Sequence, residues 1–307
     1  MKIDDSLLYE FESGLDPQHI QRSSIPATIV GYGEISAIFQ INGNETCVYK
    51  RLPLFQDQAT AAAYEKMYHE YSELLVQAGL SLPEHDTRIV SIQGRPTALY
   101  IIQEKFTGDR LCNHLVQVSD ESSSLSLIER ILTDTHKVWM YNQQNSRKIE
   151  LAIDGQLSNW IYLPQEQNSR LLYIDTSTPL YRKAGIEQQN PELMLQSAPS
   201  FLRWIIRMFF LKDVMTRYYH PRLVYTDLVA NLYKEQKPEL VEPAIHLVNR
   251  FLSNDDQPLS QKEVDGYYRE DKMIWTLFLA FRKVDRFLTT RLLRKRYEFI
   301  LPGKIKR

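Results

Sequence analysis

The sequence predicts an α+β protein in which a small antiparallel sheet precedes a larger, mainly helical region. Three observations support this. The first hundred residues alternate short apolar runs with glycine turns, among them Asn42-Gly43, a dipeptide typical of two-residue β-hairpins. Later segments such as Ser124 to Gln143 are long and amphipathic. The 307 residues, 43% hydrophobic and 24% charged, are typical of a soluble globular protein with a sizeable core.

The first predicted strands surround a glycine turn. Residues 29–41 form a strand, a turn containing Gly31 and Gly33, and a second strand, and the strand after that ends at Lys50. Glycines let a backbone approach phosphate closely, and a lysine supplies a compact positive charge for its oxygens. A G-x-G alone is also typical of a plain hairpin turn. The lysine on the next strand favours the phosphate site.

A helix is expected over residues 61–78, where apolar residues recur near helical period. Thr60 is its predicted N-cap and Gly79 its stop. Two further strands are expected over residues 88–92 and 97–102. The sheet therefore has one helix packed on it.

Three glutamates on this helix are candidates to pair with Lys50 and fix its ammonium group. They are Glu65, Glu70 and Glu73. A solvated surface position is the alternative for all three.

The segment from Gln103 to Gly108 follows the last strand of the sheet. A hinge between two lobes is expected here, with backbone groups around Glu104 and Phe106 bonded to the edge of an adenine. An ordinary loop between a strand and a helix is the alternative.

Two carboxylate-bearing loops follow, each after an apolar run. The first holds Asp154 and, five residues later, Asn159, and the second holds Asp175. This arrangement is typical of magnesium-dependent phosphoryl transfer, in which the first Asp orients and deprotonates the acceptor hydroxyl. The Asn and the second Asp hold Mg2+ against the phosphates. Alone, D-x-x-x-x-N is a weak signal, because Asp and Asn are common in loops.

The order of glycine turn, strand lysine, helix glutamate, hinge, D-x-x-x-x-N and strand-ending Asp resembles the protein-kinase-like superfamily. Within it, the chain is more similar to the aminoglycoside and choline phosphotransferase branch than to protein kinases. The resemblance covers about residues 25–180. The D-G-x-x-S-N-W and I-D-x-S-T-P motifs also resemble uncharacterised bacterial proteins.

The resemblance implies a two-lobed fold with ATP in the cleft. The N-lobe is expected over residues 1–103 and the mainly helical C-lobe over residues 104–307. Gly31 and Gly33 would form the loop that covers the phosphates. The implied activity is an ATP- and Mg2+-dependent transfer of phosphate to a hydroxyl of a small molecule.

The resemblance also implies a role for each polar residue of the site. Asp154 would be the catalytic base, and Asn159 and Asp175 the magnesium ligands. Lys50 would bind the phosphates. Glu70 is preferred as its partner, because the helix and exit loop around it are similar to those of small-molecule kinases.

Three departures from the family pattern leave the activity open. Ser36 replaces the third loop glycine, Ala152 replaces the His two residues before the base, and Thr176 replaces the Gly after the metal Asp. The phosphate and metal ligands are all retained. The alternative is an inactive nucleotide-binding or scaffold protein with a basic carboxyl-terminal docking surface.

Asp227 and Asn231 form a competing pair at a spacing of four residues. Four residues suit one face of a helix, so the first interpretation is that Asp227 is a helix N-cap. The second is a structural Asp buried beneath the catalytic loop, and the third is a catalytic role.

The carboxyl terminus has the strongest charge asymmetry in a chain of net charge −1. Residues 282–307 contain ten Lys or Arg against Asp285 and Glu298. A helix that packs one face and solvates a basic one is expected here. The alternative is contact with anionic lipid, nucleic acid or a phosphorylated substrate. No aromatic-basic nucleic-acid module accompanies it.

The remaining features favour a cytoplasmic protein. Cys47 and Cys112 lack metal-ligand spacing and indicate a reducing compartment, and the amino terminus has no signal-peptide pattern. The most apolar stretch, residues 201–211, is too short to span a membrane and carries Arg203 and Arg207. A buried helix is expected there, an interfacial helix being the alternative, and no transmembrane segment is predicted.

Overall fold

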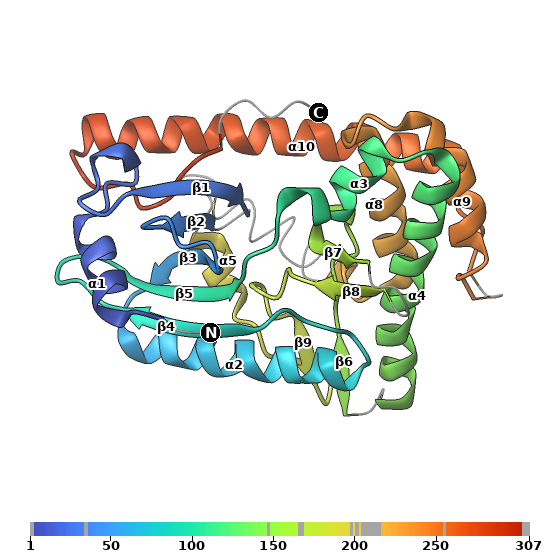
Figure 1. The fold of residues 1–307 in the computed structure, drawn as a ribbon, viewed down its shortest axis with the longest axis horizontal. Coiled ribbons are helices and arrows are strands. Elements are labelled where there is room, and N and C mark those ends of the chain that lie inside the picture. The colour runs from blue at the N-terminus through green and yellow to red at the C-terminus, as the bar shows by residue number, and fades with distance from the viewer. Residues whose placement is uncertain are drawn as a thin grey trace.

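The computed structural model describes residues 3–33, 36–145, 148–164, 169–196, 216–253 and 256–302, together with Pro199 and Arg203. A sheet lies at one end of the molecule, a group of helices at the other, and one long helix runs along both (Figure 1). This combination of an antiparallel sheet with several helices confirms the predicted α+β class.

A five-stranded antiparallel sheet with the order β1-β2-β3-β5-β4 forms the first third of the chain. Its strands are β1 (Ala27–Tyr32), β2 (Ala37–Ile41), β3 (Cys47–Phe55), β4 (His85–Val90) and β5 (Thr97–Glu104). Asn42 and Gly43 connect β2 to β3 with φ values of 50° and 67°. The predicted hairpin turn is therefore confirmed, since this turn needs positive φ at both central residues.

Helices cover both faces of this sheet. Phe11 of α1 (Asp5–Gly14) belongs to the apolar cluster that contains Tyr100. The next residue along β5 toward its start, Leu99, faces the opposite side and packs in the cluster formed with α2 (Gln58–Gln77). The alternation follows from the two-residue period of a strand.

α2 confirms the predicted helix but begins earlier than expected. Its N-cap is Asp57, whose carboxylate accepts a hydrogen bond from the Thr60 N–H at 2.8 Å. Thr60 returns a hydroxyl contact to the Asp57 backbone, completing a capping box. The prediction that Thr60 is the N-cap is therefore wrong. Gly79, with φ of 94°, follows the helix end as predicted.

The rest of the chain is mainly helical. Its helices are α3 (Cys112–Val118), α4 (Glu121–Asn145), α5 (Pro191–Gln196), α8 (Pro221–Lys234), α9 (Val241–Asn249) and α10 (Gln261–Phe287). α4 confirms the amphipathic helix predicted from Ser124 to Gln143, and it buries Ile128, Ile131 and Trp139 in the largest core cluster. α8 and α9 complete that core.

Short strands connect the sheet to the helices. β6 (Ile149–Leu151), β9 (Tyr181–Lys183) and β10 (Ile186–Glu187) form one small sheet, and β7 (Trp160–Leu163) pairs with β8 (Arg170–Tyr173). Short 3-10 turns are η1 (Ile20–Arg22), η2 (Gly108–Arg110), η3 (Leu157–Asn159) and η4 (Pro238–Leu240). Asp154 lies in the loop between β6 and η3, and Asp175 lies in the loop after β8.

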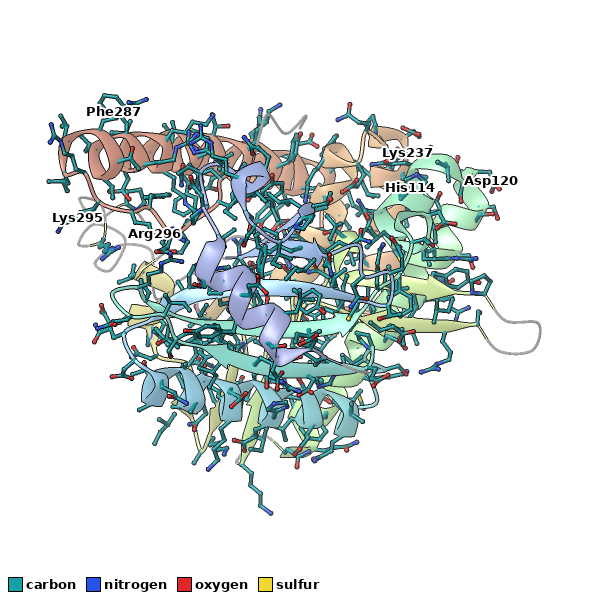
Figure 2. The ribbon with its side chains drawn as sticks, turned by 60° about the vertical axis from the view of Figure 1, so that its left-hand side comes forward. His114, Asp120, Lys237, Phe287, Lys295 and Arg296 are labelled. Carbon is teal, nitrogen blue, oxygen red and sulfur yellow. The ribbon has the colours of Figure 1, made fainter. Side chains whose placement is uncertain are left out.

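The basic carboxyl terminus is helical only in part. α10 continues into a π-helical turn, η5 (Leu288–Leu292), after which residues 293–302 return along the sheet without regular structure. Arg51 donates to the Glu298 carbonyl at 2.9 Å, so this carbonyl bonds a side chain instead of a helical N–H. Arg296 donates to the Leu15 carbonyl at 2.7 Å (Figure 2). The prediction of a helix over the whole segment is wrong for residues 293–302.

Two further predictions concern cysteines and membrane spans. Cys47 and Cys112 are both free and buried. Among the described residues, no helix has the length and apolar character needed to cross a membrane. The apolar stretch over residues 201–211 lies outside the described residues, except for Arg203.

Candidate active site

Lys50 and Asp175 meet across 125 residues of sequence. Lys50 lies on β3 with its side chain 8% exposed, directly opposite Ile101 and so on the face of the sheet covered by α2. Its Nζ lies 3.3 Å from Asp175 Oδ1 and donates to Ser177 Oγ at 3.2 Å. Asp175 remains 32% exposed. The fold thus brings two of the predicted site residues into direct contact.

Side chains of the sheet and of α2 hold the loop that carries Asp175. Gln103 at the end of β5 donates to the Ile174 carbonyl at 3.1 Å. Tyr64 of α2 donates to the Ser177 carbonyl at 2.8 Å. Sequence reasoning missed all of these loop contacts. The one local signal of these contacts was Gln103, a polar residue at the end of an otherwise apolar strand. The Gln103 side chain is buried.

The loop that carries Asp154 is closed by its own polar groups. Asp154 Oδ1 accepts from the Gln156 N–H at 3.1 Å, and Asn159 Nδ2 donates to the Asp154 carbonyl at 3.3 Å. Ile174 donates its N–H to the Asn159 carbonyl at 2.9 Å. This last bond joins the two carboxylate loops directly.

Two buried tyrosines lie beside both loops. Tyr71 of α2 donates to the Ala152 carbonyl at 2.7 Å, and the Tyr173 hydroxyl accepts from the Asp154 N–H at 3.3 Å. Burial raises the pKa of each phenol, and the charges of Asp175 and Asp154 raise it further. Asp154 and Asp175 therefore both lie near these two hydroxyls.

The expected ion pair between Lys50 and Glu70 is not formed. Glu70 instead forms an ion pair with Lys183 of β9 and accepts from the Tyr181 hydroxyl at 2.8 Å. Burial opposes ionisation of Glu70, but these hydrogen bonds outweigh it and lower the pKa of the carboxyl. Lys50 pairs with Asp175. Glu70 pairs with Lys183 because β9 lies next to the carboxyl-terminal half of α2 (Figure 1).

The glycine turn is tight where the structure describes it. Gly33 donates its N–H to the Ser36 carbonyl at 3.0 Å. A Cβ on Gly33 would lie 2.6 Å from Ser36 Oγ, and one on Gly31 would lie 3.1 Å from a methyl carbon of Ile38. A Cβ at either position would therefore require the neighbouring side chain to shift. Residues 34 and 35, at the tip of the expected phosphate loop, lie outside the described residues.

The expected hinge has its first amides already bonded. Glu104 donates its N–H to the Glu84 carbonyl and Lys105 donates to the Thr46 carbonyl, each at 2.9 Å. Phe106, which is half-buried, is the next residue in this segment. The backbone N–H groups of Glu104 and Lys105 are therefore not available to a bound base.

Asp227 is not a helix cap. It is the seventh residue of α8, which begins at Pro221, a residue suited to the first turn. Its buried carboxylate accepts from Gln156 Nε2 at 2.9 Å and from the Tyr267 hydroxyl at 2.8 Å. The N-cap prediction is wrong, and the position matches the second interpretation, a structural Asp beneath the loop of Asp154.

The donor atoms near Asp175 suit a nucleotide-bound magnesium ion. The Asn159 amide donates its N–H to the Asp154 carbonyl, and the Asn159 backbone carbonyl accepts from Ile174, the residue before Asp175. Mg2+ is commonly held by one or two protein oxygens together with phosphate oxygens and water. In the described part of the chain, no group of three or more His, Cys, Asp or Glu side chains is arranged for a metal. A metal here therefore needs phosphate ligands as well.

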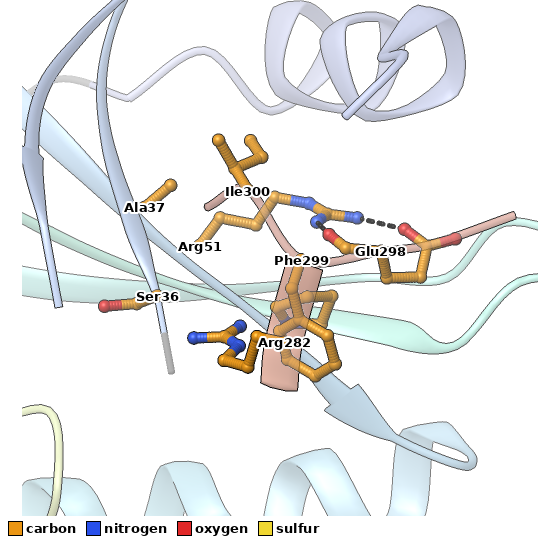
Figure 3. Close-up of a pocket in the computed structure, with 8 residues that line it drawn as sticks. Ser36, Ala37, Arg51, Arg282, Glu298, Phe299 and Ile300 are labelled. Carbon is orange, nitrogen blue, oxygen red and sulfur yellow. Dashed lines mark hydrogen bonds and ion pairs between the residues drawn. The ribbon is translucent and has the colours of Figure 1, made fainter. Parts of the chain in front are cut away.

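A small pocket lies elsewhere, between the sheet and the returning carboxyl-terminal segment (Figure 3). It is lined by residues such as Ser36, Arg51, Arg282 and Phe299. Arg51 follows Lys50 on β3, so it points to the opposite face of the sheet. This pocket is separate from the cluster around Asp154 and Asp175.

The chain belongs to a family of unknown function, DUF6206, whose model matches residues 20–286. No curated protein matches it. Among solved structures, it is similar to WaaP in complex with acyl carrier protein, at 10% identity and a TM-score of 0.35, over 75% of this chain and 90% of that chain. A TM-score this low does not establish a common fold.

Proposed function

We propose that this protein is an ATP- and Mg2+-dependent phosphotransferase acting on a hydroxyl of a small molecule. The contact between Lys50 and Asp175 beside the Asp154–Asn159 loop carries the proposal. A strand lysine, a strand-ending Asp and an Asp-to-Asn loop on separate elements are the parts that phosphoryl transfer requires. The motif resemblance to aminoglycoside and choline phosphotransferases supports the choice of a small acceptor.

The proposal includes two lobes, residues 1–103 and 104–307, with nucleotide between them. The position of β5 supports this boundary, because β5 ends at Glu104 and the chain then enters the helical region. Gly31 and Gly33 would cover the phosphates, and the backbone around Glu104 and Phe106 would hold the adenine. The buried free thiols support a reducing, cytoplasmic location.

Each polar residue has one task in this mechanism. The acceptor oxygen forms a bond to the γ-phosphorus, the bond from that phosphorus to the ADP oxygen breaks, and Asp154 takes the hydroxyl proton. Lys50 neutralises phosphate oxygens, and Asn159 and Asp175 would hold Mg2+. When bound, the metal supplies further charge neutralisation at the phosphates. Catalysis is thus mainly positioning and electrostatics.

Thermal denaturation with ATP and Mg2+, separately and together, tests the proposal. A ligand that binds only the native state raises the melting temperature. We expect a rise that needs both ligands and is lost in Asp175→Ala. Asp5→Ala, which removes a 71% exposed carboxylate on α1, is the matched control and retains the rise. Absence of any shift in the wild type contradicts the proposal.

One observation favours a second candidate, an inactive nucleotide-binding protein. Glu70 is bound to Lys183, so Lys50 lacks the glutamate partner that the family pattern provides. This candidate predicts the same thermal shift with ATP and Mg2+. It differs in predicting no release of ADP in the presence of any acceptor, so a turnover assay on the same samples separates the two.

A further inference from the structure

α10 carries an apolar stripe on its solvent side. At about 100° per residue, its members fall within one arc of about 140°, along about 20 Å of helix. They are between 37% and 58% exposed: Met273, Ile274, Leu277, Phe281, Val284 and Phe287. Arg282, on the opposite side of the helix, is buried, and Asp285 is buried at the edge of the arc. The stripe is therefore an outward face and not part of the core.

The position of α10 leaves this face accessible. The helix forms the outer edge of the molecule along both the sheet and the helices (Figure 1). Phe287 lies on the outer side of α10 near its end (Figure 2). Leu292 and Leu293, in and just after η5, extend the apolar surface at 67% and 62% exposed. Contiguous exposed apolar surface of this kind marks an interaction site.

The charges around the stripe are mostly positive, although the exposed Glu270 lies one turn before Met273. Residues 272–296 contain eight Lys or Arg and one acidic residue, the buried Asp285, whereas the whole chain has a net charge of −1. The exposed members are Lys272, Lys283, Arg291, Arg294 and Lys295. The partner of this face is therefore anionic as well as apolar.

We propose that α10 and the segment after it bind the surface of an anionic phospholipid membrane, with the helix lying parallel to the bilayer. An apolar arc flanked by Lys and Arg is the pattern of an interfacial helix. Acyl chains would receive the apolar stripe, and lipid phosphates would pair with the basic residues. A second copy of the chain is disfavoured as the occupant, because two such faces would bring like charges together.

This surface is independent of the nucleotide site. Binding to vesicles uses α10, while the proposed catalysis uses Lys50, Asp154 and Asp175. If both proposals hold, the protein is a membrane-bound phosphotransferase. Its acceptor hydroxyl would then belong to a molecule in or at the bilayer. Either proposal can fail without the other.

Co-sedimentation of the full chain with vesicles tests the proposal. The probes are vesicles of phosphatidylcholine alone and of phosphatidylcholine with phosphatidylglycerol. We expect binding to the second kind only, weakened by added salt because salt screens exposed charges. Leu277→Glu with Val284→Glu is expected to abolish it. Lys283→Glu with Arg291→Glu is expected to reduce affinity by more than about tenfold, since each basic residue near the surface contributes about fivefold.

Matched controls separate the face from general effects of charge. Val118→Glu changes an apolar residue of α3 that is 66% exposed, and Lys262→Glu changes an exposed lysine in the first turn of α10, outside the stripe. Both variants are expected to bind as the wild type does. Circular dichroism and the melting temperature establish that every variant is folded.

Four results would overturn the proposal. The first is no binding of the wild type to anionic vesicles. The second is binding that Leu277→Glu with Val284→Glu leaves intact. The third is binding to single-stranded RNA but not to vesicles, which would assign the basic residues to nucleic acid. A dimer in light scattering that the same substitutions dissociate, without vesicle binding, would assign the stripe to a second copy.

Discussion

Gln156 and Asp227 join the loop of Asp154 to α8, with Gln156 Nε2 donating to Asp227 Oδ2 at 2.9 Å. Tyr267 of α10 donates to the other carboxylate oxygen at 2.8 Å. One buried carboxylate therefore links three segments that are distant in sequence. Its position beneath the loop makes it a positioning group and not a reacting one.

Asp227 should make stability depend on pH. Burial raises the pKa of Asp227, although hydrogen bonds from Tyr267 and Gln156 and the charge of Arg217 oppose this. Because the folded state then holds the proton more tightly than the unfolded state, this contribution favours folding below the ordinary Asp pKa. This stabilisation is lost as pH rises through the raised pKa that Asp227 has in the folded state. Asp227→Asn should remove this dependence in urea unfolding measured from acid to neutral pH. If the wild type instead becomes more stable than the variant as pH rises, the pKa of Asp227 is lowered in the folded state. The hydrogen bonds would then outweigh burial in setting that pKa.

Gly155 should not tolerate a larger side chain. A Cβ there would lie 3.0 Å from a methyl carbon of Val224 on α8. Gly155→Val should therefore reduce the free energy of unfolding by about 1–3 kcal/mol through overpacking. Gly108→Val is the control, since a Cβ at Gly108 meets no atom within 4 Å. Equal losses in urea denaturation of both variants would show that the contact with α8 is unimportant.

Arg51 should be a large contributor to folding. Its guanidinium bonds both Glu12 oxygens at 2.7 Å and Glu298 Oε2 at 2.9 Å, and all three side chains are buried. Arg51→Met removes the Arg51 ion pairs of two buried carboxylates, which leaves Glu298 with Arg296 and Glu12 with the Tyr100 hydroxyl, at an expected cost of about 3–5 kcal/mol. Arg88→Met breaks ion pairs of a 33% exposed arginine and should cost less than about 1 kcal/mol. Chemical denaturation of both variants measures the difference.

Asp154→Asn should separate binding from turnover. If Asp154 takes the hydroxyl proton, its amide variant should lose about 10²- to 10⁴-fold in rate. The thermal shift with ATP and Mg2+ should remain, because the proposed metal ligands Asn159 and Asp175 are unchanged. ADP release with an accepted substrate, compared between the two proteins, is the measurement. Equal rates would remove Asp154 from the catalytic role.

Glu70→Gln should leave nucleotide binding intact. Glu70 bonds Lys183 and Tyr181, whereas Lys50 is positioned by Asp175 and Ser177. Melting temperatures with ATP and Mg2+ should therefore rise equally in Glu70→Gln and the wild type. Lys50→Met is the comparison and should lose the rise. A loss in Glu70→Gln as well would show that Glu70 turns to Lys50 when nucleotide binds.

Features set by local interactions were predictable. Positive φ at Asn42 and Gly43 marks the β2–β3 turn, and the apolar spacing of α4 marks a buried helix face. The start of α2 was displaced by three residues because Asp57 and Thr60 are both capping residues, and their reciprocal contact decides which one caps. Which of two neighbouring capping residues begins a helix is decided by contacts between residues a few positions apart.

The sequence by itself determined the α+β class, the strands of the first sheet, the helices α2 and α4, and the polar residues Lys50, Asp154, Asn159 and Asp175 as candidates for one site. Tertiary structure alone decided their partners. It placed Lys50 on Asp175 and Glu70 on Lys183, and it returned residues 293–302 to the sheet. The physical reason is range: secondary structure follows from neighbours a few residues apart, whereas a buried charge takes whichever opposite charge the packed chain brings within contact distance.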